Sequence, residues 1–257
     1  MSNNYHKPED TSEEIFEGIY STKLNLMKDI WEVMGYDLQK TEPHIVFKNY
    51  LAEDPITLGG SMDLGLGDLG SIDNASLNGL SLDQLMKVFS GAKRDYLGAC
   101  LLVLDRFGST VGLNDKGKLF VLAQMGHESG NFRYTHELGN GQGRQYGLPS
   151  GPYNKIYYGR GPIQITWEGN YKAISEKYFP QMGIDVDIWK NPELCETNLA
   201  VGCAASLAWF LLPGNGQRAV KYANAGDVNG LTKMINGGTN GLTDRINKTK
   251  KLLALVT

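Results

Sequence analysis

The chain has 257 residues, of which 41% are hydrophobic, and a formal net charge of −3 at pH 7. This length can bury one large or two small cores, and no apolar stretch reaches the roughly 18 residues that a membrane-spanning helix needs. The charge is uneven: residues 1–89 hold 6 Lys/Arg and 15 Asp/Glu, a net −9, whereas residues 90–257 hold 19 and 13, a net +6. The basic part suits a polyanionic partner, although an ordinary solvated surface explains the surplus equally well.

The first residues, MSNNYHKPED, contain no basic region followed by an apolar run, so we expect no secretory signal. We therefore expect synthesis in a cytoplasm, with any target outside it reached by another route. The three cysteines, Cys100, Cys195 and Cys203, lack CxxC spacing. We expect them to be reduced, buried thiols rather than a disulfide framework or a zinc site.

The N-terminal third is predicted to form a small helical and extended region, 1–57, followed by a linker. Apolar residues recur every three or four positions over 11–39, which predicts an amphipathic helix, and 43–56 reads as an extended segment. Residues 58–80 are rich in Gly, Asp and Leu, which is typical of a linker. Their Asp-Leu-Gly units resemble an acidic cation-binding loop, but the ligand spacing of an EF-hand is absent, so we expect no metal or other cofactor.

The remainder, 81–257, is predicted to be a mainly α-helical domain. Ser81 and Gln84 fit a capping box that opens its first helix. The segment 198–212 is apolar on nearly every face and is predicted to be the buried central helix. The segment 131–160 is rich in Gly and Pro and is predicted to be loop. The predicted helices are 81–90, 92–107, 116–129, 171–179, 198–212, 227–235 and 242–255.

Two carboxylates near the middle of the chain differ in their surroundings. Glu128 ends a mostly apolar helix, and burial would favour its protonated form, which suits a general acid. Glu137 lies in polar loop, where it should be ionised and able to activate water. Each also has an ordinary interpretation, because Glu128 could pair with an arginine at a helix end and Glu137 could be a solvated surface residue.

The segment YYGRGPIQIT, residues 157–166, has the pattern of a strip that lines a binding site. Gln164 and Thr166 alternate with Ile163 and Ile165, so the polar pair should face one side and the apolar pair the core. Glycines in this segment would let the backbone approach a ligand closely. Tyr157 and Tyr158 could supply aromatic faces for sugar rings.

These segments together resemble glycoside hydrolase family 19, which contains plant-type chitinases and bacteriophage endolysins. The resemblance rests on HES followed by a second Glu, on YYGRGPIQIT-x-x-x-NY, and on INGG-x-x-G-x-x-x-R, and it spans roughly residues 85–255. It implies a two-lobed, lysozyme-like, mostly helical fold with a deep cleft. The short spacing between the two glutamates and the lack of extra loops resemble the endolysins more than the plant chitinases.

The resemblance also implies roles for individual residues. Glu128 matches the general acid, Glu137 the general base of an inverting mechanism, and Thr166 the residue that helps to hold the attacking water. The residues that match sugar-binding or cleft positions are His127, Tyr158, Gln164, Asn170, Asn236 and Arg245.

We therefore predict a peptidoglycan-degrading endolysin or muramidase that acts on the cell wall after release from a host bacterium. A chitinase acting on N-acetylglucosamine polymers is the alternative within enzymes. A virion- or tail-associated lysin, anchored through residues 1–80, is the alternative of another class. The expected partner is peptidoglycan or a related N-acetylated glycan, with no nucleic acid.

Overall fold

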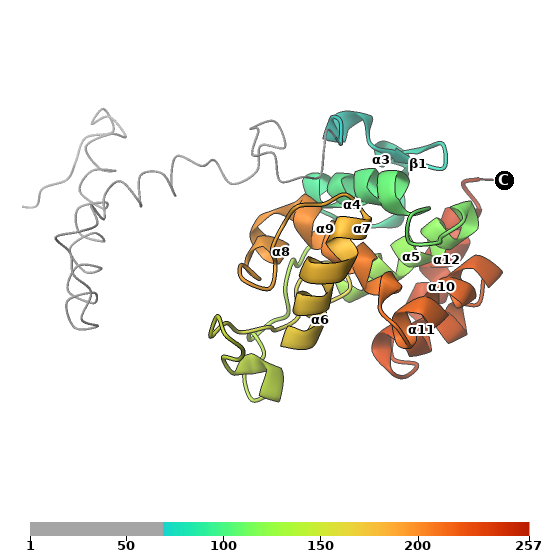
Figure 1. Ribbon diagram of the computed structural model, residues 1–257. Helices are drawn as coiled ribbons and strands as arrows, with labels where there is room; N and C mark the ends of the chain where they lie inside the picture. Colours follow the sequence, from blue (N-terminus) through green and yellow to red (C-terminus); the bar gives the residue numbers. More distant parts are fainter. Residues whose placement is uncertain (1–68, 257) are drawn as a thin grey trace, which may run out of the picture. The chain divides into compact units, whose positions relative to one another are not determined.

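The computed structural model describes residues 69–256, and this part is mainly helical (Figure 1). The mainly α-helical fold class predicted for the domain is confirmed. The helix predicted over 11–39, the extended segment over 43–56 and most of the proposed linker lie outside the described residues.

The described chain begins with a 3-10 turn, Ile72–Asn74, and a hairpin of two short antiparallel strands, β1 (Ser76–Leu77) and β2 (Leu80–Ser81). Asn78 and Gly79 form its turn with φ of 53° and 78°, and Asn-Gly is the dipeptide best suited to such a turn. Leu77 and Leu80 are buried in the core. The prediction of linker up to residue 80 is therefore wrong for this hairpin, because its leucines are core residues.

Most helices lie where the hydrophobic pattern predicted them. The capping box is present, since Ser81 accepts from the Gln84 N–H and the Gln84 side chain accepts from the Ser81 N–H. The sequence pattern missed α10 and the short α8. The α-helices are α3 (Leu82–Val88), α4 (Arg94–Phe107), α5 (Asp115–Glu128), α6 (Glu168–Ala173), α7 (Phe179–Gln181), α8 (Leu194–Thr197), α9 (Leu199–Ala208), α10 (Asn215–Ala225), α11 (Val228–Asn236) and α12 (Leu242–Leu253), with short 3-10 helices at Gln145–Gly147 and Trp209–Leu211 and a short π-helix at Ile174–Tyr178.

Helix α9 is the centre of the core, as predicted, and is buried on nearly all faces. Asn198 caps it by accepting from the Val201 N–H at 3.1 Å. It packs against α4, and a disulfide joins Cys100 of α4 to Cys203 of α9. All three cysteines are buried as expected, but only Cys195 is free. The prediction of three reduced thiols is wrong for the other two, because helix packing brings together cysteines that are 103 positions apart.

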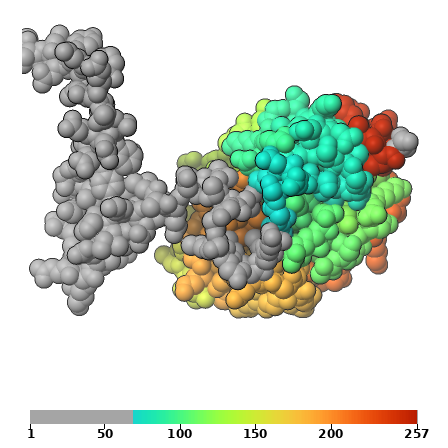
Figure 2. All heavy atoms as spheres, turned by 90° about the horizontal axis from the view of Figure 1, so that it is seen from above, coloured from blue at the N-terminus to red at the C-terminus, as the bar shows by residue number. Residues whose placement is uncertain are grey.

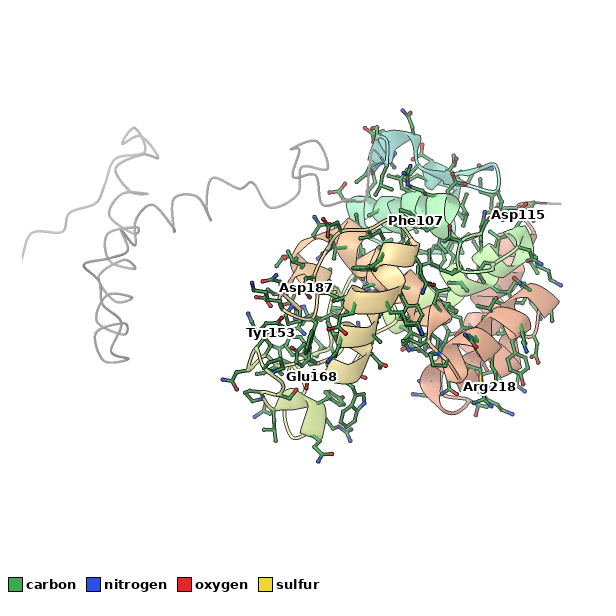
Figure 3. All side chains as sticks on the ribbon, viewed as in Figure 1. Phe107, Asp115, Tyr153, Glu168, Asp187 and Arg218 are labelled. Atoms are coloured by element: carbon green, nitrogen blue, oxygen red, sulfur yellow. A yellow bond between two sulfur atoms is a disulfide. The ribbon has the colours of Figure 1, made fainter. Side chains whose placement is uncertain are left out.

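The helices gather on two sides of α4 and α9. Figure 1 shows α6 and α8 with the 131–160 loop on one side and α5, α10, α11 and α12 on the other. Figure 3 places labelled side chains accordingly, with Tyr153, Glu168 and Asp187 on the first side and Asp115 and Arg218 on the second. In Figure 2 the segment that starts at residue 69 (cyan) lies on the face seen from above, next to green, orange and red parts of the chain.

No single described helix has the length and hydropathy to cross a membrane. The pair formed by Leu199–Leu211 and Asn215–Ala225 meets the length and composition test only when taken together, and it is bent by 94°.

Gly202 of α9 lies close to the backbone of two other segments, at Cys195 and at Gly161. A Cβ at this position would lie 2.3 Å from the carbonyl oxygen of Cys195, and the Gly161 Cα is close by. We expect Gly202→Ala to lower the free energy of unfolding by about 1–3 kcal/mol, because backbone must move to admit the methyl group. Urea unfolding measures this change. Gly169→Ala is the matched control, since nothing lies within 4 Å of its Cβ position; an equal loss in both variants would contradict this explanation.

Candidate active site

Glu128, the last residue of α5, is held by an arginine from α12. The Arg245 Nη2 donates to the Glu128 Oε1 at 2.5 Å, and the side chains are 0% and 16% exposed, respectively. The ordinary interpretation of Glu128 as a helix-end partner of an arginine is thus present in the structure. It does not exclude catalysis, because Arg245 is bonded to Oε1, and no other described residue donates to Oε2, which is left for a substrate.

The buried Arg245 belongs to a polar chain that crosses three helices. Its Nη1 donates to the side-chain oxygen of Gln124, and the Gln124 Nε2 donates to the Thr232 hydroxyl at 3.3 Å. That hydroxyl donates to the Val228 carbonyl at 2.7 Å. A buried charge needs such partners, so this chain fixes the guanidinium and, with it, the Glu128 carboxylate.

His127 precedes Glu128 and is also held by α12. Its Nδ1 lies 2.6 Å from the Asp244 Oδ2, and a quarter of its side chain is exposed. Three of the predicted site residues, His127, Glu128 and Arg245, are therefore brought together where the end of α5 meets the start of α12.

Glu137 is anchored to the predicted strip. The Gly159 N–H donates to its Oε1 at 2.7 Å, and its own N–H donates to the Gly159 carbonyl at 2.8 Å. The Tyr146 hydroxyl donates to Oε2 at 3.2 Å. Burial, followed by the charge of Glu137, raises the pKa of Tyr146, so the phenol keeps the proton that it donates. These two contacts hold both carboxylate oxygens of Glu137 in one orientation.

The strip has the predicted alternation. Ile163 and Ile165 are 7% and 2% exposed, whereas Gln164 and Thr166 are half-buried. A Cβ at Gly159 would contact both Gln164, at 3.0 Å, and the Glu137 Cβ, at 3.4 Å. Glycine therefore allows these two side chains to lie beside the same short segment of backbone.

Asn170 supports the strip from α6. Its Nδ2 donates to the Thr166 carbonyl at 2.8 Å, and its N–H donates to the Trp167 carbonyl at 3.0 Å. Asn170 is half-buried. Glu137, Gln164, Thr166 and Asn170 thus form a second group around one segment of chain.

The prediction that Tyr157 and Tyr158 offer faces to sugar rings is wrong, because they are only 1% and 8% exposed. The Arg160 guanidinium lies 3.5 Å from the centroid of the Tyr158 ring, and the Tyr158 hydroxyl donates to Glu196 at 3.0 Å. Glu196 also contacts the His136 Nδ1 at 3.2 Å. Both tyrosines, at the start of this strip, are therefore part of the core and not of a ligand-facing surface.

Trp167 is an exposed aromatic residue that the sequence analysis missed. It is 49% exposed, follows Thr166 directly, and packs edge-on against Tyr146 with ring centroids 5.4 Å apart. Its φ of 72° is unusual for a residue with a large side chain. Tyr146, whose hydroxyl donates to Glu137, thus connects the Trp167 ring to the proposed base. A tryptophan directly after a polar strip was the available signal.

Asn236 is exposed at the end of α11, where Gly237 with φ of 76° ends the helix. The loop that follows leads to Gly241, which contacts His127, and then to α12. Within residues 69–256, the Asn236 side chain forms no hydrogen bond with either of the two groups.

Comparisons with known proteins agree on one family. The family model described as Chitinase class I matches residues 114–230. An endochitinase of Arabidopsis thaliana is 31% identical over 183 residues, which are 68% of this chain and 60% of that protein. A basic endochitinase of Brassica napus is 30% identical over 191 residues, which are 69% and 65%, respectively. The chain spans less than two thirds of the length of these two relatives.

Solved structures share the helical fold. Chitinase C from Streptomyces griseus is similar with a TM-score of 0.51 and 27% identity, covering 68% of this chain and 76% of that chain. A bacterial family 19 chitinase gives a TM-score of 0.50 at 26% identity. The expected lysozyme-like, family 19 fold is thereby confirmed. With the matched segment and the relatives in agreement, the chain belongs to glycoside hydrolase family 19.

Proposed function

We propose that the protein is an inverting glycoside hydrolase that cuts the glycan backbone of bacterial peptidoglycan. The observation that carries the proposal is that two carboxylates are held by different partners: Glu128 by a buried guanidinium, and Glu137 by a backbone N–H and a phenol. Two carboxylic groups in unlike settings are what acid and base roles in glycoside hydrolysis require.

In this mechanism Glu128 protonates the leaving glycosidic oxygen through Oε2, while Arg245 holds Oε1. Glu137 removes a proton from a water on the opposite face of the sugar. Thr166 and Gln164 help to position this water, since they are half-buried polar groups on the strip to which Glu137 is bonded. The inverting mechanism requires about 6.5–9.5 Å between the two carboxyl groups, which leaves room for the water.

Peptidoglycan is proposed as the substrate because residues 90–257 carry a net +6 and the glycan wall is anionic. This part of the proposal includes release of the enzyme from a bacterial cytoplasm, as for an endolysin. Chitin is the second candidate, favoured by relatives that are named endochitinases. Attachment to a virion through residues 1–80 is a further candidate, and detection of the protein in purified particles would support it.

The substrate is tested by comparing lysis of permeabilised bacteria with release of fragments from an N-acetylglucosamine hexamer. We expect the wild-type chain to clear the bacterial suspension and Glu128→Gln to reduce lysis by about 10²–10⁴-fold, because the general acid is lost. The amide retains an acceptor for Arg245, and circular dichroism checks that the fold is kept. Hexamer cleavage without lysis would assign chitin instead, and near-native lysis by the variant would exclude the acid role.

The base role is tested by the stereochemistry of the product. We expect proton NMR, recorded before mutarotation, to show the inverted anomer, because water attacks from the face opposite to the leaving group. Release of the retained anomer would mean that Glu137 acts as a nucleophile or not at all.

Trp167 is expected to bind a sugar ring beside Glu137. Trp167→Ala should raise KM by about 2- to 10-fold and leave kcat nearly unchanged, because stacking contributes to ground and transition states alike. Trp167→Phe should recover most of the loss. Tyr153→Ala removes another exposed aromatic residue, one that packs on Trp189, and serves as control. Equal effects of the two alanine variants would argue against a sugar contact specific to Trp167.

A further inference from the structure

Two adjacent residues at the end of α5 are clamped by two adjacent residues at the start of α12. Glu128 is paired with Arg245, and His127 with Asp244. The proposed mechanism uses the first pair and assigns nothing to Asp244. The second pair is the shorter of the two histidine–carboxylate contacts in the described chain, at 2.6 Å against 3.2 Å for His136 and Glu196.

Asp244 is an ionised acceptor at this position. Lys248, one turn further along α12, donates to the same Oδ2 that faces His127. Burial alone would favour the neutral acid, but the hydrogen bonds from His127 and Lys248 outweigh it and hold the pKa of Asp244 below its ordinary value. A carboxylate has no proton to donate, so the proton in the contact must be on the His127 Nδ1.

The backbone of Gly241 restricts the other end of the ring. A Cβ at this residue would lie 2.1 Å from the His127 Nε2 and 2.2 Å from Cε1, so only a glycine admits the ring here. Its φ of 70° is one that glycine adopts at little cost. The imidazole is therefore held between a carboxylate and a glycine, with a quarter of the side chain exposed.

We propose that Asp244 is a positioning residue that fixes His127 as the tautomer protonated on Nδ1. In the neutral ring Nε2, which lies next to Gly241, is then a hydrogen-bond acceptor. The ligand groups that fit it are donors, namely a hydroxyl or the acetamido N–H of an N-acetylated sugar. This last step rests on the proposed function, whereas the assignment of the tautomer does not.

Nitrogen-15 NMR of the full-length protein tests the tautomer. The chain has four histidines, and the His127 signals are identified by their loss in His127→Gln. At a pH of about 8, where an ordinary imidazole is neutral, we expect the wild-type His127 to be protonated on Nδ1. Asp244→Asn should shift the proton to Nε2, because the amide can donate to Nδ1. A wild-type ring protonated on Nε2, or a tautomer that is unchanged in Asp244→Asn, would overturn the proposal.

Lys248→Met is the matched control, because it removes a charge from the same cluster but keeps the carboxylate. The tautomer should persist in this variant, and its loss would contradict the assigned role of Asp244.

Affinity for an N-acetylglucosamine hexamer, measured in a Glu128→Gln background that does not hydrolyse it, should fall about tenfold in Asp244→Asn and less than twofold in Lys248→Met. Unchanged affinity in Asp244→Asn would overturn the ligand step alone. Absence of glycan binding and cleavage by the wild-type chain would refute the proposed function, while the NMR result would still decide the tautomer.

Discussion

The site on the α5 side depends on one buried charge. The Arg245 side chain is completely buried, and removal of a guanidinium from water costs several kcal/mol unless its donors are satisfied. Gln124 and Glu128, which both belong to α5, provide the acceptors for Nη1 and Nη2, while the buried Nε has none. This pairing therefore sets the register of the start of α12 on the end of α5. That register also places Asp244 against His127, so two adjacent contacts follow from the position of one arginine.

A second buried arginine has a similar function on the other side of the domain. Arg160 is 4% exposed, lies over the Tyr158 ring and pairs with Glu196 at 3.6 Å. The backbone of Arg160 also forms isolated antiparallel β-bridges with His136 and with Ile165. The segment that carries Glu137 and the strip that carries Thr166 are thus held together through this residue. In both halves a proposed catalytic carboxylate is supported by a buried guanidinium, directly for Glu128 and through the backbone for Glu137.

This organisation explains how a loop rich in glycine can hold a catalytic group. The segment 131–160 has little regular secondary structure, yet Glu137 takes part in four hydrogen bonds: two with Gly159, one with Tyr146 and one from the Asn140 N–H to its carbonyl. The tyrosines behind the strip are buried, and Tyr171 donates to the Tyr158 carbonyl at 2.8 Å. Rigid placement therefore comes from side chains that pack under the loop rather than from a strand or helix that contains it.

Much of the domain was predictable from sequence, because the information is local. Apolar periodicity located α4, α5, α9, α11 and α12, and the Ser81 and Gln84 pair located a helix start. The Asn78-Gly79 turn was also readable, but the surrounding Gly, Asp and Leu favoured a linker. Helix α10 was missed since Gly and Asn at its start resemble a loop. Helix α10 packs against α5 and α11, and such contacts between distant segments cannot be predicted from a local sequence pattern.

By itself, the sequence determined the family, the helical class and the two carboxylates, because these depend on residue types at short spacing. Tertiary structure alone decided which groups meet: Arg245 with Glu128, Asp244 with His127, and Cys100 with Cys203. It also decided that Tyr158 is buried while Trp167 is exposed. These pairings join residues more than 100 positions apart, and burial depends on the folded surroundings of a residue. Neither the pairings nor the burial can therefore be predicted from a short stretch of sequence.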